Sequence, residues 1–135
     1  MNQTSSKPTN TLTEAPVLDC DHILTQAGGD PELLIQLCNV FLHEIPIRLD
    51  TLRAAMEKGH GVATGRALQH LRNCLIVFGT GPVSLTADTL QSALYGGRQR
   101  QARREWKRLQ SQIEVLVPQV QRLMLEVSTP RTAVQ

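Results

Sequence analysis

The sequence predicts an all-α protein built as one domain. Apolar residues make up 41% of the 135 residues, whereas aromatic residues make up only 3%. This balance suits packed helices better than a sheet, because strands favour β-branched and aromatic side chains. Apolar residues also recur at spacings of three and four over long stretches, which is the period of one helix face. A chain of this length can bury about two thirds of its unfolded surface around a single core.

The two ends of the chain differ in composition from its centre. Residues 1–16 are rich in Ser, Thr, Asn and Pro, and they offer little apolar surface to offset the entropy lost on ordering. Residues 128–135 have a similar character. We therefore predict a disordered N-terminal segment, a helical domain over residues 17–127 and a flexible C-terminal tail.

Glycine and proline mark the first two helices. A short helix is expected over about Asp19–Gln26, because Gly28 and Gly29 can adopt the positive φ that ends a helix. The second helix begins after Asp30, whose side chain can accept from a free backbone N–H, and the proline that follows suits the first turn. Pro46 is expected to bend this helix without ending it. Its apolar stripe consists of Leu34, Leu37, Phe41, Ile45, Leu49, Leu52 and Met56.

Three more helices are expected beyond Gly59. The third covers about Gly61–Phe78, the fourth opens at Pro82 and ends at Gly96, and the fifth covers about Gln99–Val127. Because short connections place neighbouring helices antiparallel, we expect an up-and-down antiparallel four-helix bundle, with the additional short N-terminal helix covering one end. The buried face of the fifth helix is expected to consist of Trp106, Leu109, Ile113, Leu116, Val120, Leu123 and Val127.

Charge and cysteine content argue against several classes of protein. The net charge of +2 would not drive the whole chain onto nucleic acid or an anionic membrane. The longest uncharged run is too short to span a bilayer, and the first residues lack the basic-then-apolar order of a signal peptide. Three cysteines without metal-type spacing argue against a disulfide framework or a metal site. We therefore predict a cytoplasmic protein with no cofactor, no metal and no membrane contact.

Two adjacent residues on the third helix, Gln69 and His70, bear most directly on function. With Leu71 at the centre of the core face, Gln69 falls at about 160° around the helix and is expected to face solvent. Asn73 and Ile76 share this outer side. His70 falls at about 100° on one flank, where a neighbouring helix is expected. We therefore expect His70 to be partly buried and hydrogen-bonded across a helix contact.

A long part of the chain resembles the histidine-containing phosphotransfer (HPt) family. The segment AGGDPELLIQLCNVFL, residues 27–42, is similar to the pattern that opens the family's second helix. The family's central motif is His-x-Leu-Lys-Gly, with a further Gly ten residues after the histidine. Leu71 lies two residues after Gln69, where the motif has its Leu, and Gly79 lies ten residues after Gln69, where the motif has its further Gly. Both therefore place Gln69 at the acceptor position. The resemblance covers about residues 17–124, and it implies a helical bundle that relays phosphoryl groups between aspartates of response-regulator receiver domains.

The sequence departs from this motif at the residue that defines the activity. A glutamine amide is a poor nucleophile without a titratable lone pair at neutral pH, so Gln69 cannot accept a phosphoryl group. Asn73 adds a side chain where the family's Gly leaves room for the attacking partner, whereas Arg72 keeps the positive charge of the family's Lys. The resemblance therefore implies a module that binds a receiver domain, a hybrid histidine kinase or both, and not an independent enzyme. The expected partner-binding residues are Arg66, Arg72, Asn73 and Ile76.

Two other functions remain open. In the first, His70 is itself the phosphoacceptor, which requires a register shift of the helix near Gly65. In the second, the chain binds nucleic acid through the segment from Arg98 to Arg108, whose six basic residues and one acidic residue give a local charge of +5. Nucleic acid is not the favoured partner, because no recognisable motif or stacking aromatic accompanies this segment. We call five of its residues the basic stripe: Arg100, Arg103, Arg104, Lys107 and Arg108.

Overall fold

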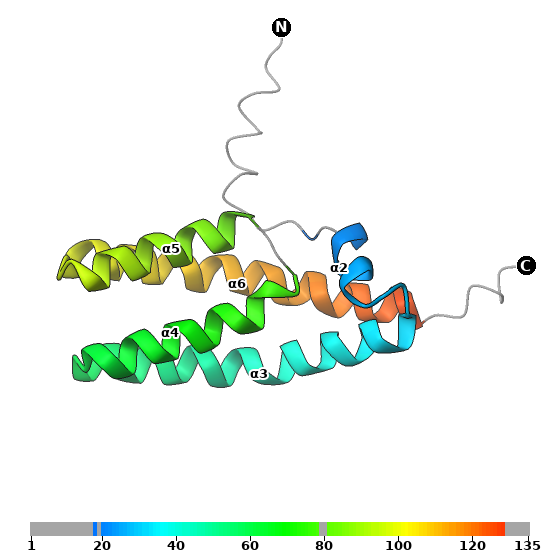
Figure 1. Ribbon diagram of the computed structural model, residues 1–135, viewed down its shortest axis with the longest axis horizontal. Helices are drawn as coiled ribbons and strands as arrows, with labels where there is room; N and C mark the ends of the chain where they lie inside the picture. Colours follow the sequence, from blue (N-terminus) through cyan, green and yellow to red (C-terminus); the bar gives the residue numbers. More distant parts are fainter. Residues whose placement is uncertain (1–17, 19, 79–80, 129–135) are drawn as a thin grey trace, which may run out of the picture.

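The computed structural model describes residues 18, 20–78 and 81–128 (Figure 1). Within these residues every regular element is a helix, so the prediction of an all-α protein is confirmed. The predicted disordered segment 1–16 and residues 129–135 of the predicted tail lie outside the described residues. The helices are α2 (Cys20–Gln26), α3 (Pro31–Lys58), α4 (Gly61–Ile76), α5 (Gly81–Tyr95) and α6 (Gln99–Ser128).

The helix ends follow the predicted glycine and proline signals. α3 begins after Asp30, whose carboxylate accepts a hydrogen bond from the backbone N–H of Glu32 at 3.0 Å. It ends at Gly59, which has a φ of 72° and donates its N–H to the last carbonyls of the helix. Glycine adopts this left-handed conformation with little strain. α3 and α6 each continue as one helix through Pro46 and Pro118 respectively.

The four long helices lie along one another, α3 with α4 and α5 with α6 (Figure 1). α6 also packs against α3, whereas α4 and α5 contact each other much less. α4 and α5 diverge toward the end of the molecule where α3 passes into α4 (Figure 1). The short helix α2 contacts α3 near the other end. None of the helices in the described part of the chain combines the length and hydropathy needed to cross a membrane.

The core lies between the four long helices. On α4 the predicted core face is confirmed, because Leu71 is fully buried and the residues that the helical period places beside it are buried as well. Phe41 of α3 meets Phe78, just beyond α4, with ring centroids 4.7 Å apart and ring planes at 61°, an edge-to-face contact. This contact holds the end of α4 against α3. The other buried residues of this face are Thr64, Ala67, Leu68 and Leu75.

Cys38 makes the stability of the protein depend on pH. Its side chain is fully buried in α3, and this burial raises the pKa of the thiol from 9.0 to about 11, because a thiolate is poorly solvated in the core. Between these two values the unfolded chain loses a proton that the folded protein keeps. The free energy of unfolding is therefore expected to fall by roughly 2 kcal/mol as the pH rises from about 9 to about 11.

Urea unfolding of the wild type and of Cys38→Ala, each at about pH 8 and about pH 11, measures this effect. The alanine variant controls for every other effect of pH on stability, and it should show a clearly smaller fall between the two pH values. An equal fall in both proteins would mean that Cys38 is not the group responsible.

Candidate functional site

The outer side of α4 carries the residues that the HPt resemblance places around the acceptor. Gln69 is exposed, as predicted, and its amide nitrogen donates to the side-chain oxygen of Asn73 at 3.1 Å, one turn further along. Asn73 and Ile76 are exposed as well, and the side chain of Ile76 leaves 60% of its surface open to solvent. This side of α4 therefore presents two amides and one aliphatic group to solvent.

Arg72 connects α4 to α5. It is partly buried, and its guanidinium lies 2.5 Å from a carboxylate oxygen of Asp88 and donates to the side-chain oxygen of Gln91 at 2.6 Å. Asp88 and Gln91 are three residues apart on α5 and therefore lie on the same face of that helix. Because Asp88 already neutralises Arg72, an incoming phosphoryl group would have to compete with this carboxylate for the cation.

A small cavity of about 270 Å³ lies between α4 and α5 at this contact. Its polar lining comes mostly from side chains that bond within the molecule, including Gln69 and Arg72. None of these amides or guanidinium groups is a nucleophile at neutral pH. Among the described residues no cluster of His, Cys, Asp and Glu could hold a metal ion. The amides and the guanidinium group of this lining are suited to hydrogen bonding.

The expectation that His70 is partly buried at a helix contact is wrong, because the side chain is exposed. The buried arc of α4 is narrower than this expectation assumed. Viewed down the helix axis, the buried residues span about 100°, with Ala67 at one edge of the arc and Leu68 at the other. His70 lies about 60° beyond the Ala67 edge. Even Cys74, on the same flank but nearer the core, is only partly buried. Gln69 and His70 therefore both reach solvent, on different sides of α4.

Comparison with protein-family models, with curated proteins and with solved structures finds no match for this chain. What the site does must therefore be inferred from its own residues.

The predicted site residues are only partly brought together. Gln69, Arg72 and Ile76 line the small cavity, and Asn73 joins them through its hydrogen bond to Gln69. Arg66 is exposed but does not line this cavity. His70 lies outside it, on the flank opposite Arg72. The predicted motif glycine, Gly79, lies outside the described residues.

The sequence interpretation missed Asp88 and Gln91, the partners of Arg72. The available signal was their spacing of three on the fourth predicted helix, which places a carboxylate and an amide on one face. That signal does not say which neighbouring helix the pair faces, because contacts between helices depend on their packing and not on their periodicity. An arginine on the third helix could therefore be recognised as charged, but not as already paired.

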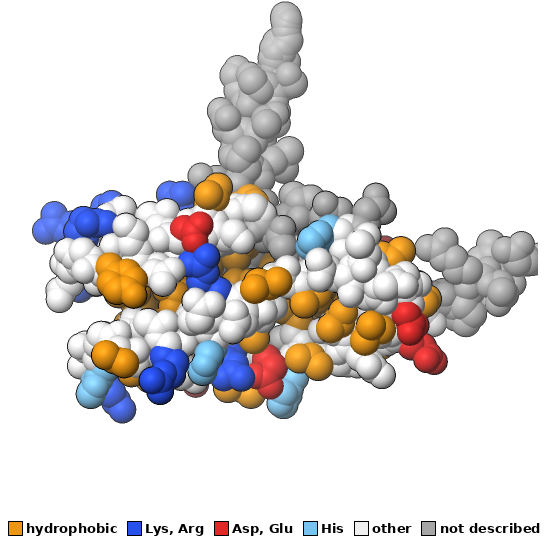
Figure 2. Space-filling model, in the orientation of Figure 1, with side chains coloured by type: hydrophobic (Ala, Val, Ile, Leu, Met, Phe, Trp, Pro, Cys, Tyr) orange, Lys and Arg blue, Asp and Glu red, His pale blue; other side chains and the backbone are white. Residues whose placement is uncertain are grey.

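The basic stripe lies on the outside of α6. All five of its residues are exposed, whereas Trp106, on the same helix, keeps only 9% of its surface open to solvent. Figure 2 shows lysine and arginine side chains gathered at the end of the molecule where α5 passes into α6. Arg98, at the start of this segment, donates to Ser92 and Gln101 and so holds the connection between the two helices. The stripe thus gives this end of the molecule a positive surface.

Proposed function

We propose that the chain is an HPt-like signalling module of two-component systems that binds a receiver domain or a hybrid histidine kinase without conventional phosphotransfer. In this proposal the four long helices form an up-and-down four-helix bundle of the HPt type. The observation that carries the proposal is the position of Gln69. An exposed amide stands where the resemblance expects the acceptor, bonded to Asn73 and next to an arginine that is already paired.

The chemistry of phosphoryl transfer supports this reading. A phosphoacceptor must offer a neutral, accessible ring nitrogen in line with the donor phosphorus. The lone pair of an amide nitrogen is delocalised into its carbonyl, so Gln69 offers no such atom. The surface around it nevertheless keeps what docking needs, namely exposed amides and the aliphatic side chain of Ile76. Binding is therefore retained while the acceptor is lost.

Such a module would regulate a relay by occupying the receiver domain. A receiver domain that is covered by this protein is not available to an active phosphotransfer partner that uses the same face. The flux of phosphoryl groups through the relay would then fall as the concentration of this protein rises above its dissociation constant for the receiver.

The exposure of His70 favours a second candidate function, in which this histidine accepts the phosphoryl group. Its ring is accessible, which is one of the requirements for an acceptor. A partner approaching it would come from a different side of α4, because His70 and Gln69 lie about 100° apart around the helix. On that side of α4, Arg66 is a cation one turn before His70, whereas Arg72 lies on the opposite flank.

One experiment separates the two functions. The protein is mixed with a panel of receiver domains phosphorylated by acetyl phosphate, and both complex formation and acid-labile phosphate on the protein are measured. We expect saturable binding of at least one receiver and no acid-labile phosphate, in the wild type and in His70→Ala alike. Phosphate on the wild type that disappears in His70→Ala would establish the second function and overturn the first.

The same assay tests the docking face through Ile76→Asp. Because this side chain is 60% exposed, the substitution should leave the fold intact and weaken receiver binding by about tenfold, since it places an unpaired charge in the interface. Val40→Asp on α3 is the matched control, with 58% of the side chain exposed and no contact with the small cavity. Equal effects of the two substitutions would place the receiver elsewhere.

A further inference from the structure

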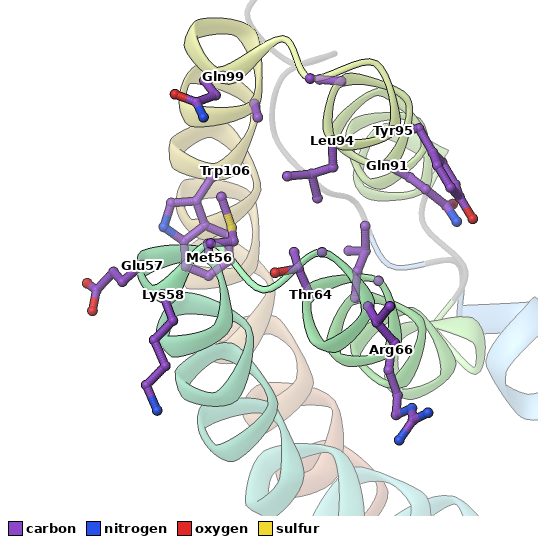
Figure 3. Close-up of a pocket in the computed structure, with 18 of the residues that line it drawn as sticks. Met56, Glu57, Lys58, Thr64, Arg66, Gln91, Leu94, Tyr95, Gln99 and Trp106 are labelled. Carbon is purple, nitrogen blue, oxygen red and sulfur yellow. The ribbon is translucent and has the colours of Figure 1, made fainter.

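A second, larger cavity of about 1200 Å³ opens at the end of the molecule where α3 passes into α4 and α5 passes into α6 (Figure 3). It lies between helices from both pairs, at the end toward which α4 and α5 diverge (Figure 1). Gln69 and Gln91 line this cavity and the small one. The two cavities therefore adjoin, and we call the larger one the α4–α5 groove.

Apolar side chains form the inner part of this groove. Leu94 of α5 points into it, and Met56 of α3 and Trp106 of α6 lie on the opposite wall (Figure 3). Val62 and Tyr95 also line it, and they keep 80% and 87% of their surfaces exposed. Apolar surface that is concave, and that no described residue covers, is typical of a binding groove.

Gly65, in the interior of α4, borders open space in the groove. This glycine lines the cavity, and a Cβ atom built on it would meet nothing within 4 Å. Its φ is not positive, so neither close packing nor backbone conformation within the molecule requires glycine there. Glycine nevertheless costs a helix up to about 1 kcal/mol relative to alanine. The space it leaves is open to the backbone of a second molecule.

Basic residues surround the apolar part. Lys58, Arg66 and Arg103 line the groove and form no ion pair within the described part of the chain. Lys58 and Arg66 extend outward from its rim (Figure 3). The single acidic residue in the lining is Glu57. Figure 2 shows basic side chains on both sides of this end of the molecule. The groove therefore combines an apolar floor with a positively charged rim.

We propose that the α4–α5 groove binds an amphipathic helix of a partner protein, whose apolar stripe is flanked by acidic residues. The stripe would occupy the floor, and its carboxylates would meet the rim. A helix satisfies its own backbone hydrogen bonds, which an apolar floor cannot do for an extended peptide. The cavity also exceeds the roughly 300–1000 Å³ typical of small-molecule sites.

The end segments of this chain do not have the required composition. Residues 1–16 contain one acidic residue, Glu14, and residues 129–135 contain none. The expected occupant is therefore a separate protein. This site adjoins the receiver-binding face and shares Gln69 with it, but Ile76 does not line the larger cavity. The proposal does not depend on phosphotransfer or on its loss.

Trp106 provides the readout, because it lines the groove and is the single tryptophan of the chain. The probe is a synthetic helical peptide of about 16 residues, or about 24 Å, with leucines on one face and glutamates on both sides of them. We expect a saturable change in Trp106 fluorescence. The same peptide with lysines in place of glutamates should bind at least about tenfold more weakly, and added salt should reduce this difference.

Two pairs of variants locate the binding. Gly65→Leu places a side chain in the open space of the groove. Because leucine is a better helix former than glycine, the variant should fold at least as well as the wild type. It should bind the peptide at least about tenfold more weakly, because the new side chain occupies the groove. Ala63→Leu, exposed on the same helix but outside both cavities, should bind normally. Arg103→Glu should weaken binding severalfold, whereas Arg122→Glu, exposed on α6 away from the groove, should not.

Several results would overturn the proposal. These are the absence of any fluorescence change, equal binding of the glutamate and lysine peptides, or unchanged binding by Gly65→Leu. A response to sodium dodecanoate but not to the glutamate peptide would assign the groove to a small anionic amphiphile. Self-association by light scattering that Gly65→Leu abolishes would assign it to a second copy of the chain. None of these results involves Ile76→Asp, so failure here is distinguishable from failure of the receiver-binding proposal.

Discussion

Leu71→Ala is expected to lower the free energy of unfolding by about 2–5 kcal/mol. Leu71 is fully buried at the centre of the core face of α4, where the side chains beside it are also buried. Truncation removes apolar contacts and leaves a cavity that close-packed neighbours fill only in part. Urea unfolding followed by circular dichroism measures the loss.

Leu85→Ala is the matched control for this change. It removes the same atoms from a side chain on α5 that is 67% exposed, so its effect should stay within about 0.5 kcal/mol. A loss in Leu71→Ala as small as that in Leu85→Ala would show that this face of α4 is not packed against the core. The orientation of Gln69 and Arg72, which follows from the same helix, would then have to be revised as well.

If the proposed function is right, the double substitution Gln69→His with Asn73→Gly is expected to create phosphotransfer that the wild type lacks. It restores an imidazole on the exposed side of α4 and removes the side chain that crowds it. Arg72 stays close enough to stabilise the charge of the phosphoryl group once Asp88 releases it. Acid-labile phosphate after incubation with a phosphorylated receiver should rise from background to a substantial fraction of the protein.

The control for this gain is the same double variant carrying His70→Ala. Phosphate that persists in this triple variant lies on the introduced imidazole, as expected. Phosphate that is lost with His70 would show that the native histidine is the acceptor. A double variant that binds a phosphorylated receiver but takes up no phosphate would count against the HPt resemblance as a guide to this surface.

Local signals were sufficient to predict the helices. Asp30 and Gly59 are recognisable from sequence, because capping and positive φ depend on a few neighbouring residues. The core face of α4 was also predictable, since Leu68, Leu71 and Leu75 recur at the period of the helix. The helix positions are therefore properties of short segments of the chain.

The features that sequence analysis missed all depend on the spacing of neighbouring helices. His70 is exposed because the buried arc of α4 is narrow, and periodicity gives the centre of such an arc but not its width. The pairing of Arg72 with Asp88, and the groove beside it, depend on where α5 diverges from α4. The link to phosphorelay signalling stays a prediction, because it depends on the resemblance around Gln69.

The contact of Arg72 with Asp88 and Gln91 has a mechanical consequence. It joins α4 and α5 part-way along a pair that is otherwise in sparse contact. Any force that widens the gap at the Gly61 end must rotate the two helices about this point or break it. The contact thus acts as a pivot. A change in the spacing of α4 and α5 at the Gly61 end would therefore displace Gln69, which lies one turn from Arg72.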